Sequence, residues 1–469
     1  MRTRLLLLAL SCTFAALPAS ATTLRAVTSA AAAPPPGAIS SNVEYLTTVA
    51  DLDTVIALAF DGDLMFVSTT AGLLSYDIAN PAAPRLLGAL PMYIWENEDM
   101  TIDPVRNRVF ISRDPRGFTS PATPGTAFPY GAIHVVSYAN PQVLTQVGFF
   151  TVPAGHTSTC VNACDFLWTG GPYANTTSNP GFTGRPIYAT DVRDPANPVH
   201  CPSPIDTGRN DGVTDYAHDV QVDDEGIAWV SGAGGIRGYW TQGTHHDPVS
   251  QTTRLATACN PIPYGGGGSD TEGTPSRFMH NSQRTPSAAI PGDEGSRGNI
   301  LMGTEENITS NCNTSGRFAT YDLRGSLDGE GFIDIANTHF RMTTLDTWTP
   351  QAAEGADACA SAHYFDDRGD GLLAYGFYSQ GTRFLDVSNP TAIRQVGYFR
   401  PDDANTWAAY WHSGVVFIAD NGRGIDIVRF RDDAGAAPAD MPSVAAPPAA
   451  TPAVHLAMDP ALGYLCPLR

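Results

Sequence analysis

A short unit, consisting of an extended strand, an Asn-Pro turn and a second extended strand, recurs along this chain and constrains its fold. The clearest copy runs from Gly381 to Tyr398, with Asn389-Pro390 between its two extended runs. Proline cannot donate a ladder hydrogen bond and asparagine favours turns, so this pair ends one strand and starts a reversal. Related copies follow Gly72, Gly131 and Pro186, and weaker ones begin at Gly235, Gly316 and Gly424. Each copy therefore represents one structural repeat.

The number of copies predicts a closed ring. Helical periodicity is nearly absent, and each unit accommodates four short strands separated by Gly, Pro and Asn turns, which is typical of a β-propeller. We therefore predict an all-β chain that forms a single seven-bladed β-propeller over residues 42–431. The glycines that mark the seven units are Gly72, Gly131, Gly184, Gly235, Gly316, Gly381 and Gly424.

The last of these units is one strand short. It ends near Arg431 after three predicted strands, whereas Val43–Val49 precedes the first complete unit and has no blade of its own. We predict that this N-terminal strand closes the last blade as its outer strand. Closure of this kind protects sheet edges that would otherwise pair with other chains.

The segments outside the predicted propeller resemble an export signal and two linkers. Residues 1–21 combine Arg2 and Arg4, an apolar run and a small-residue cleavage site at Ala19-Ser20-Ala21, as a signal peptide does. Residues 22–41 are rich in Ala and Pro and are predicted to be a disordered linker, and residues 432–469 an Ala/Pro-rich tail. No later stretch reaches the roughly 18 apolar residues of a membrane helix. We expect no membrane span and a secreted or periplasmic location.

Charge and cysteine content narrow the set of partners and the redox compartment. The formal net charge is −20, which disfavours nucleic acid as a partner because phosphate binding needs clustered Lys and Arg. Seven cysteines would remain after signal cleavage, and cysteines of an exported protein can pair. Cys160 and Cys164 are the most local candidate pair, but the sequence does not determine the connectivity.

The repeated unit resembles the LVIVD repeat of bacterial exported β-propeller proteins. The best matches are Arg383-Phe-Leu-Asp-Val-Ser-Asn-Pro390 and Leu74-Ser-Tyr-Asp-Ile-Ala-Asn-Pro81. The resemblance covers about residues 43–431 and implies the propeller fold. It implies no particular activity, because the repeat is architectural.

When the units are aligned, one position that opens the innermost strand carries a histidine in four consecutive blades. Innermost strands converge on the propeller axis, so these imidazoles are candidate ligands of one transition-metal ion, Fe, Cu or Zn. Glu98 can either ligate the ion or hold a histidine in its metal-binding tautomer, and the same two roles are open to Glu305, Glu306 and Asp219. We place Glu98 and Glu305 in the supporting role. The complete ring of equivalent positions is Thr54, Glu98, His156, His218, His280, His363 and Thr406.

Two other roles for the four histidines stay open, namely packing in a half-wet channel and a proton-sensitive or substrate-binding cluster. We expect His245, His246 and His412 to lie on the surface. The function favoured by the sequence is an exported binding or scaffold module with a small-molecule or protein ligand on its channel face. The alternative is a metal-dependent oxidoreductase. Long predicted loops that could display a ligand surface are 116–130, 171–184, 242–277 and 283–298.

Overall fold

The computed structural model describes residues 34–432, except for several internal segments. The predicted signal peptide, residues 22–33 of the predicted linker and residues 433–469 of the tail lie outside the described residues, as do the predicted loop 116–130 and residues 172–184 of its neighbour. No helix among the described residues is long and apolar enough to cross a membrane. The internal segments outside the description are 93, 95–96, 115–130, 172–185, 206–216, 233–234, 248–249, 265–277, 307–315, 325–341 and 351–360.

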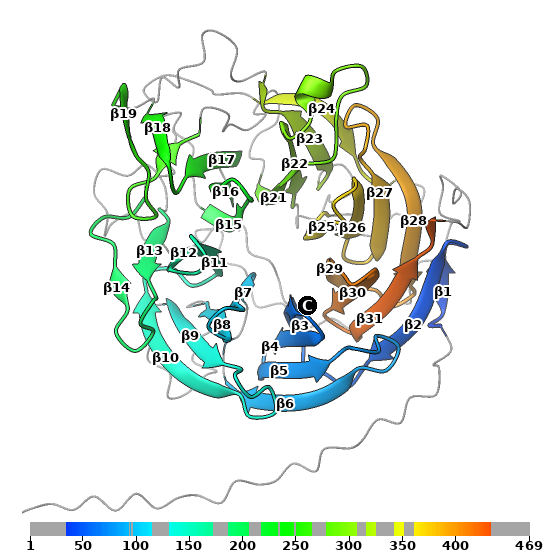
Figure 1. Ribbon diagram of the computed structural model, residues 1–469. Helices are drawn as coiled ribbons and strands as arrows, with labels where there is room; N and C mark the ends of the chain where they lie inside the picture. Colours follow the sequence, from blue (N-terminus) through cyan, green and yellow to red (C-terminus); the bar gives the residue numbers. More distant parts are fainter. Residues whose placement is uncertain are drawn as a thin grey trace, which may run out of the picture. The chain divides into compact units, whose positions relative to one another are not determined.

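Seven antiparallel sheets surround one axis, which confirms the seven-bladed propeller (Figure 1). Apart from the two N-terminal strands that are added to blades 6 and 7, the first strand of each blade in chain order lies nearest the axis. Blade 1 consists of β3 (Val55–Asp61), β4 (Leu64–Thr69), β5 (Gly72–Asp77) and β6 (Arg85–Pro91). Blade 2 consists of β7 (Met100–Asp103), β8 (Arg108–Arg113), β9 (Gly131–Ser137) and β10 (Thr145–Val152). Blade 3 consists of β11 (Thr157–Val161), β12 (Phe166–Gly170), β13 (Tyr188–Asp191) and β14 (Val199–His200).

The remaining four blades follow the same order, with N-terminal strands added to the last two. Blade 4 consists of β15 (Ala217–Val222), β16 (Ile227–Gly232), β17 (Gly235–Trp240) and β20 (Ile262–Pro263), and blade 5 of β21 (Met279–Thr285), β22 (Ile300–Glu305), β23 (Phe318–Asp322) and β24 (Thr343–Trp348). Blade 6 consists of β25 (Phe365–Asp367), β26 (Leu372–Gly376), β27 (Thr382–Asp386), β28 (Arg394–Pro401) and the N-terminal β1 (Gly37–Ile39). Blade 7 consists of β29 (Thr406–His412), β30 (Val415–Asp420), β31 (Gly424–Phe430) and the N-terminal β2 (Val43–Val49).

The predicted closing strand is confirmed. Strand β2 pairs antiparallel with β31, from Val43 opposite Phe430 to Val49 opposite Ile425. It supplies the fourth strand of blade 7, so the first and last parts of the propeller share one sheet.

The boundary of the predicted linker is corrected. Gly37–Ile39 forms β1, which pairs with Phe399–Pro401 of β28 as a fifth strand on blade 6. The strand has three residues and follows Pro34-Pro35-Pro36, a composition typical of linkers. It covers the outer edge of blade 6, which would otherwise present unpaired backbone groups.

Two predicted loops contain regular structure. The segment 242–277 includes the hairpin β18 (Thr244–Asp247) and β19 (Thr252–Leu255), which forms its own two-stranded sheet, and also β20. The segment 283–298 begins within β21 and contains the short 3₁₀ helix η3 (Glu294–Ser296). Neither segment is therefore a loop throughout: β20 belongs to blade 4 and β21 to blade 5, whereas β18 and β19 form a separate hairpin.

The recurring Asn-Pro unit has a local physical basis. The side-chain oxygen of Asn389 accepts a hydrogen bond from the Thr391 N–H at 3.0 Å, and Asn80 accepts one from Ala82 at 3.2 Å. Such bonds let asparagine stabilise a turn after the third strand. In blade 1 the turn is further held by an ion pair of 2.8 Å between Asp77 and Arg85.

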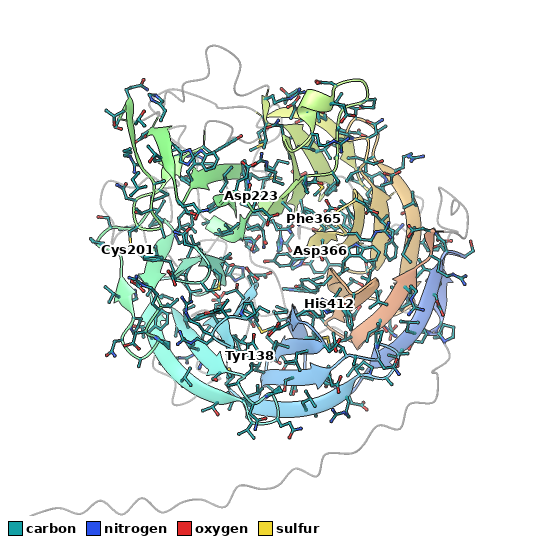
Figure 2. All side chains as sticks on the ribbon, viewed as in Figure 1. Tyr138, Cys201, Asp223, Phe365, Asp366 and His412 are labelled. Carbon is teal, nitrogen blue, oxygen red and sulfur yellow. A yellow bond between two sulfur atoms is a disulfide. The ribbon has the colours of Figure 1, made fainter. Side chains whose placement is uncertain are left out.

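Apolar side chains fill the spaces between neighbouring blades and hold the ring together. The largest buried side chains include Trp168, Trp229 and Trp407. Polar contacts add to this packing: Tyr138 of blade 2, labelled in Figure 2, donates a hydrogen bond of 2.8 Å to Asp61 of blade 1.

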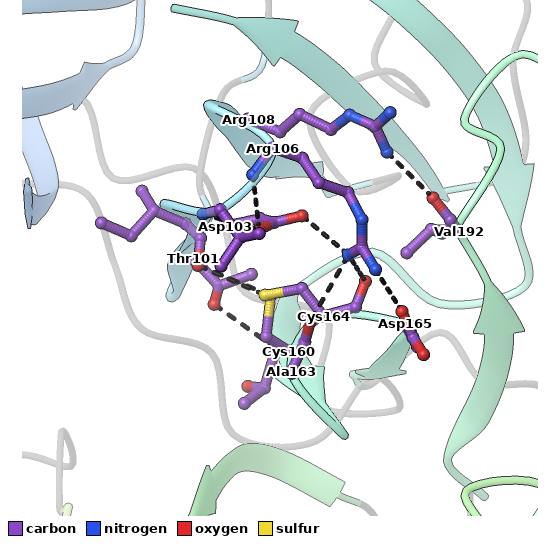
Figure 3. Close-up of a disulfide and its surroundings, with 12 residues drawn as sticks. Thr101, Asp103, Arg106, Arg108, Cys160, Ala163, Cys164, Asp165 and Val192 are labelled. Atoms are coloured by element: carbon purple, nitrogen blue, oxygen red, sulfur yellow. Dashed lines mark hydrogen bonds and ion pairs between the residues drawn. A yellow bond between two sulfur atoms is a disulfide. The ribbon is translucent and has the colours of Figure 1, made fainter.

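Two disulfides link described cysteines, Cys160–Cys164 and Cys201–Cys259. The first closes the turn between β11 and β12 (Figure 3). Arg106 of blade 2 holds this turn by donating to the Ala163 and Cys164 carbonyl oxygens at 3.3 and 3.2 Å. Disulfides of this kind persist in oxidising compartments.

Candidate metal centre

The structure brings the four predicted histidines together on the propeller axis. His218 and His280 lie near the starts of β15 and β21, while His156 and His363 lie one and two residues before β11 and β25. All four are buried, with at most 1% of their surface exposed. Neighbouring ring centroids are 4.6, 4.3 and 3.8 Å apart along the series from His156 to His363.

Hydrogen bonds from Nδ1 orient three of the rings. Nδ1 of His218 lies 3.1 Å from the His280 carbonyl oxygen, and Nδ1 of His363 lies 2.7 Å from that of Trp407. A carbonyl oxygen can only accept, so both neutral rings carry their proton on Nδ1 and present the lone pair of Nε2. The Asp114 carboxylate, 2.8 Å from Nδ1 of His156, acts in the same way.

The Nε2 atoms face one another and the carboxylate of Glu98. Nε2 of His156 lies 2.8 Å from Nε2 of His218. Glu98, itself 1% exposed, places its oxygens 3.6 Å from Nε2 of His156, 3.5 Å from that of His280 and 3.7 Å from that of His363. Of the two roles open to Glu98, these distances favour that of a direct ligand, because its oxygens lie where ligands of an ion would lie.

The neighbouring residues Glu305 and Glu306 direct their side chains to different partners. Glu305, at the end of β22, forms an ion pair of 3.2 Å with Arg317. Glu306 lies close to His218 and His280, and its carboxylate accepts a hydrogen bond from the Tyr378 hydroxyl. Successive residues of an extended strand point to opposite sides, which explains the difference.

Asp114 was not anticipated from the sequence. It directly follows β8, the second strand of blade 2, just as Glu306 directly follows β22, the second strand of blade 5. A comparison of the residues that directly follow the second strands would therefore have identified both carboxylates as neighbours of the four histidines.

Asp219 and the two ring threonines have other contacts. Asp219 accepts hydrogen bonds from Tyr364 and Gln221, each at 3.2 Å. Thr54 accepts a backbone bond from Thr70, and Thr406 lies 3.4 Å from Asp420. None of these three residues belongs to the groups of candidate metal ligands among the described residues.

Burial lowers the pKa of three of the four histidines. It lowers the pKa of His280 to about 4, an effect that nearby Glu306 partly offsets. Burial, reinforced by the neighbouring imidazoles, holds the pKa values of His218 and His363 well below the usual range. At neutral pH these rings are neutral, the form in which histidine binds metals.

The separations of the ligand atoms fit a transition metal. Two atoms bonded to one ion at about 2.1 Å lie at most about 4.2 Å apart, and the measured separations run from 2.8 to 3.7 Å. Imidazole with carboxylate suits Fe, Cu and Zn. Three buried groups could each hold an ion: Glu98, His156 and His218; Glu98, His280 and His363; and His218, His280 and Glu306.

The three histidines that were predicted to lie on the surface are not part of this centre. His246 is exposed, whereas His245 is half-buried and stacks on Trp240 with ring centroids 3.8 Å apart. His412 (Figure 2) stacks on Phe60 at 4.5 Å and bonds to the Gly62 carbonyl oxygen at 2.7 Å.

Comparisons with known proteins identify no family. No protein-family model matches the chain, and no curated protein sequence matches it. The solved structures that it resembles include the β-propeller domain of Cps50 (Swd1) from Myceliophteria thermophila, with 9% sequence identity and a TM-score of 0.49. That similarity covers 82% of this chain and 99% of the other.

Proposed function

We propose that this propeller binds a transition metal, Fe, Cu or Zn, through His156, His218, His280, His363 and Glu98, and acts as a metal-dependent oxidoreductase. When bound, Fe or Cu would supply one-electron chemistry and any of the three ions would act as a Lewis acid.

The contact between His156 and His218 carries this proposal. Both rings hold their proton on Nδ1, so both present a lone pair on Nε2, and these two atoms are 2.8 Å apart. Two lone pairs repel at that distance unless a cation lies beside them. Hydrogen bonds to Nδ1 that orient Nε2 are the usual support of metal-binding histidines.

We also propose that the protein is exported from the cytoplasm. Its repeat is proposed to be of the LVIVD type. The signal-like residues 1–21 and the disulfides Cys160–Cys164 and Cys201–Cys259 support export. The strand–Asn-Pro–strand unit supports the LVIVD assignment, which itself implies no activity.

Metal analysis of untagged protein tests the proposal. We expect at least one Fe, Cu or Zn per chain, and a clear loss of that metal in His218→Ala. His246→Ala is the matched control, because its ring is exposed and lies outside the centre. Protein that contains no stoichiometric transition metal and takes none up from solution would exclude the proposal.

A binding module without catalysis is the second candidate. A groove of about 330 Å³ beside blade 6 is lined by Arg368, Asp386, Phe430 and Arg431 among others. It offers both charged and apolar contacts to a ligand. Metal analysis separates the two candidates, since a binding module of this kind needs no metal.

A further inference from the structure

The two oxygens of Glu98 face different pairs of histidines. Oε1 lies 3.6 Å from Nε2 of His156, which is 2.8 Å from Nε2 of His218. Oε2 lies 3.5 Å from Nε2 of His280 and 3.7 Å from Nε2 of His363. The carboxylate thus divides the four imidazoles into two pairs and offers one oxygen to each.

Two of the three groups of candidate ligands show the same division. Within each group of candidate ligands, the atoms lie within 4.8 Å of one another, and both pairs form such a group with Glu98. Among the described residues, no such group contains all four histidines. Ligands of a single ion lie at most about 4.2 Å apart, so four imidazoles spread more widely than this do not surround one ion.

We infer that the centre holds two transition-metal ions, one at His156 and His218 and the other at His280 and His363, bridged by the carboxylate of Glu98. This inference rests on the proposed metal-binding function and adds its stoichiometry. Each ion receives two imidazole nitrogens and one carboxylate oxygen from the protein, a set that leaves positions for water or substrate.

The backbone holds Glu98 in the position that a bridge requires. The Glu98 N–H donates a hydrogen bond of 2.8 Å to the His156 carbonyl oxygen, so the residue is anchored beside the first pair. Its side chain extends across the channel to the second pair, which belongs to blades 5 and 6. Two divalent cations also suit the acidic surroundings, since the carboxylates of Glu98, Asp114 and Glu306 are all buried here.

Glu306 lies where it can serve both ions. The third group of candidate ligands combines Glu306 with His218 from one pair and His280 from the other. The hydrogen bond from Tyr378 restrains its carboxylate. We therefore expect Glu306 to support the bridge between the two halves of the centre.

Copper titration of the full-length, untagged protein, stripped with a chelator, tests the inference. The wild type is expected to bind two Cu(II) ions per chain. Their EPR spectrum should show magnetic coupling, because two ions that share one carboxylate lie close together. His156→Ala and His363→Ala should each retain one ion, with an uncoupled spectrum. Glu98→Gln should abolish the coupling, and His246→Ala should match the wild type.

The outcomes separate this inference from the function on which it rests. One Cu(II) per wild-type chain, lost in both His156→Ala and His363→Ala, would leave the metal-binding proposal intact and overturn the two-ion centre. No bound copper in the wild type would overturn both. Circular dichroism establishes whether each variant is folded, and if a variant is not, the stoichiometry and coupling of the wild type still decide the question.

Discussion

Removal of the N-terminal strands should destabilise the whole propeller rather than one edge of it. Consider three purified chains that begin at Pro34, Ser41 and Asp51. The first retains both N-terminal strands, the second loses β1, and the third loses β1 and β2. Because β2 joins the first part of the chain to the last blade, the third chain lacks the contact that closes the ring.

The register of β2 sets the expected magnitude. Six residues of β2 have partners in β31, and at about 1 kcal/mol of net stability for each hydrogen bond they contribute roughly 6 kcal/mol. Burial of Val43, which is 6% exposed, adds about 2 kcal/mol. The total of about 8 kcal/mol is of the order of the whole stability of a domain. With an unfolding entropy of roughly 0.8 kcal/mol/K for about 400 residues, the melting temperature should fall by about 10 °C.

Differential scanning calorimetry provides the measurement. The chain that begins at Ser41 should melt only slightly below the reference, since β1 pairs through three residues and lies outside the four-stranded core of blade 6. A chain that ends at Asp432 should melt like the reference. If the chain that begins at Asp51 melts within 1–2 °C of the reference, a range worth about 1 kcal/mol, the closure argument is refuted.

Three further substitutions probe the backbone, the centre and the response to pH. Gly424→Ala should lower the melting temperature more than the control Gly414→Ala does. Both glycines have a positive φ, which costs alanine about 1–2 kcal/mol. A Cβ on Gly424 would also lie 2.2 Å from a backbone oxygen of β2, whereas a Cβ on Gly414 meets nothing within 4 Å. Asp114→Ala should weaken metal binding about 10–100-fold in a chelator competition, because it removes the acceptor that orients His156; unchanged affinity would contradict that role. Burial raises the pKa of Asp366 to about 7, so the folded state binds more protons than the unfolded state between about pH 4 and 7, and this group lowers stability as pH rises through that window. Asp366→Asn should therefore reduce the loss of unfolding free energy between pH 5 and pH 8, measured by urea denaturation, and an identical pH dependence would exclude this contribution.

Much of the fold was predictable because each blade carries its own turn signals. The Asn-Pro pairs and the recurring glycines mark the strands, and the missing strand of the last unit leaves Val43–Val49 as its natural partner. Strand β1 was not predictable on the same grounds. It has three residues and no turn signal, and its pairing depends on the free edge of β28, which is created only when blade 6 forms.

The sequence predicts that the four histidines lie at one height along the propeller axis, but it does not predict their contacts. Alignment of the repeats brings His156, His218, His280 and His363 to one height, because innermost strands of a propeller start at equivalent positions. The choice between Glu305 and Glu306 depends on the exact residue at which β22 ends. Patterns in a sequence determine such boundaries less well than they determine the existence of a strand.

The division of the histidines into pairs arises from contacts between blades, which no repeat contains by itself. His218 is oriented by the backbone of blade 5 and His363 by the backbone of blade 7, the blade that β2 closes. His156 instead bonds to Asp114, which follows the second strand of blade 2. The four imidazoles therefore occupy equivalent positions in the repeat but have different surroundings in the closed propeller. Blade 7 therefore both accepts the closing strand β2 and supplies the carbonyl oxygen that orients His363.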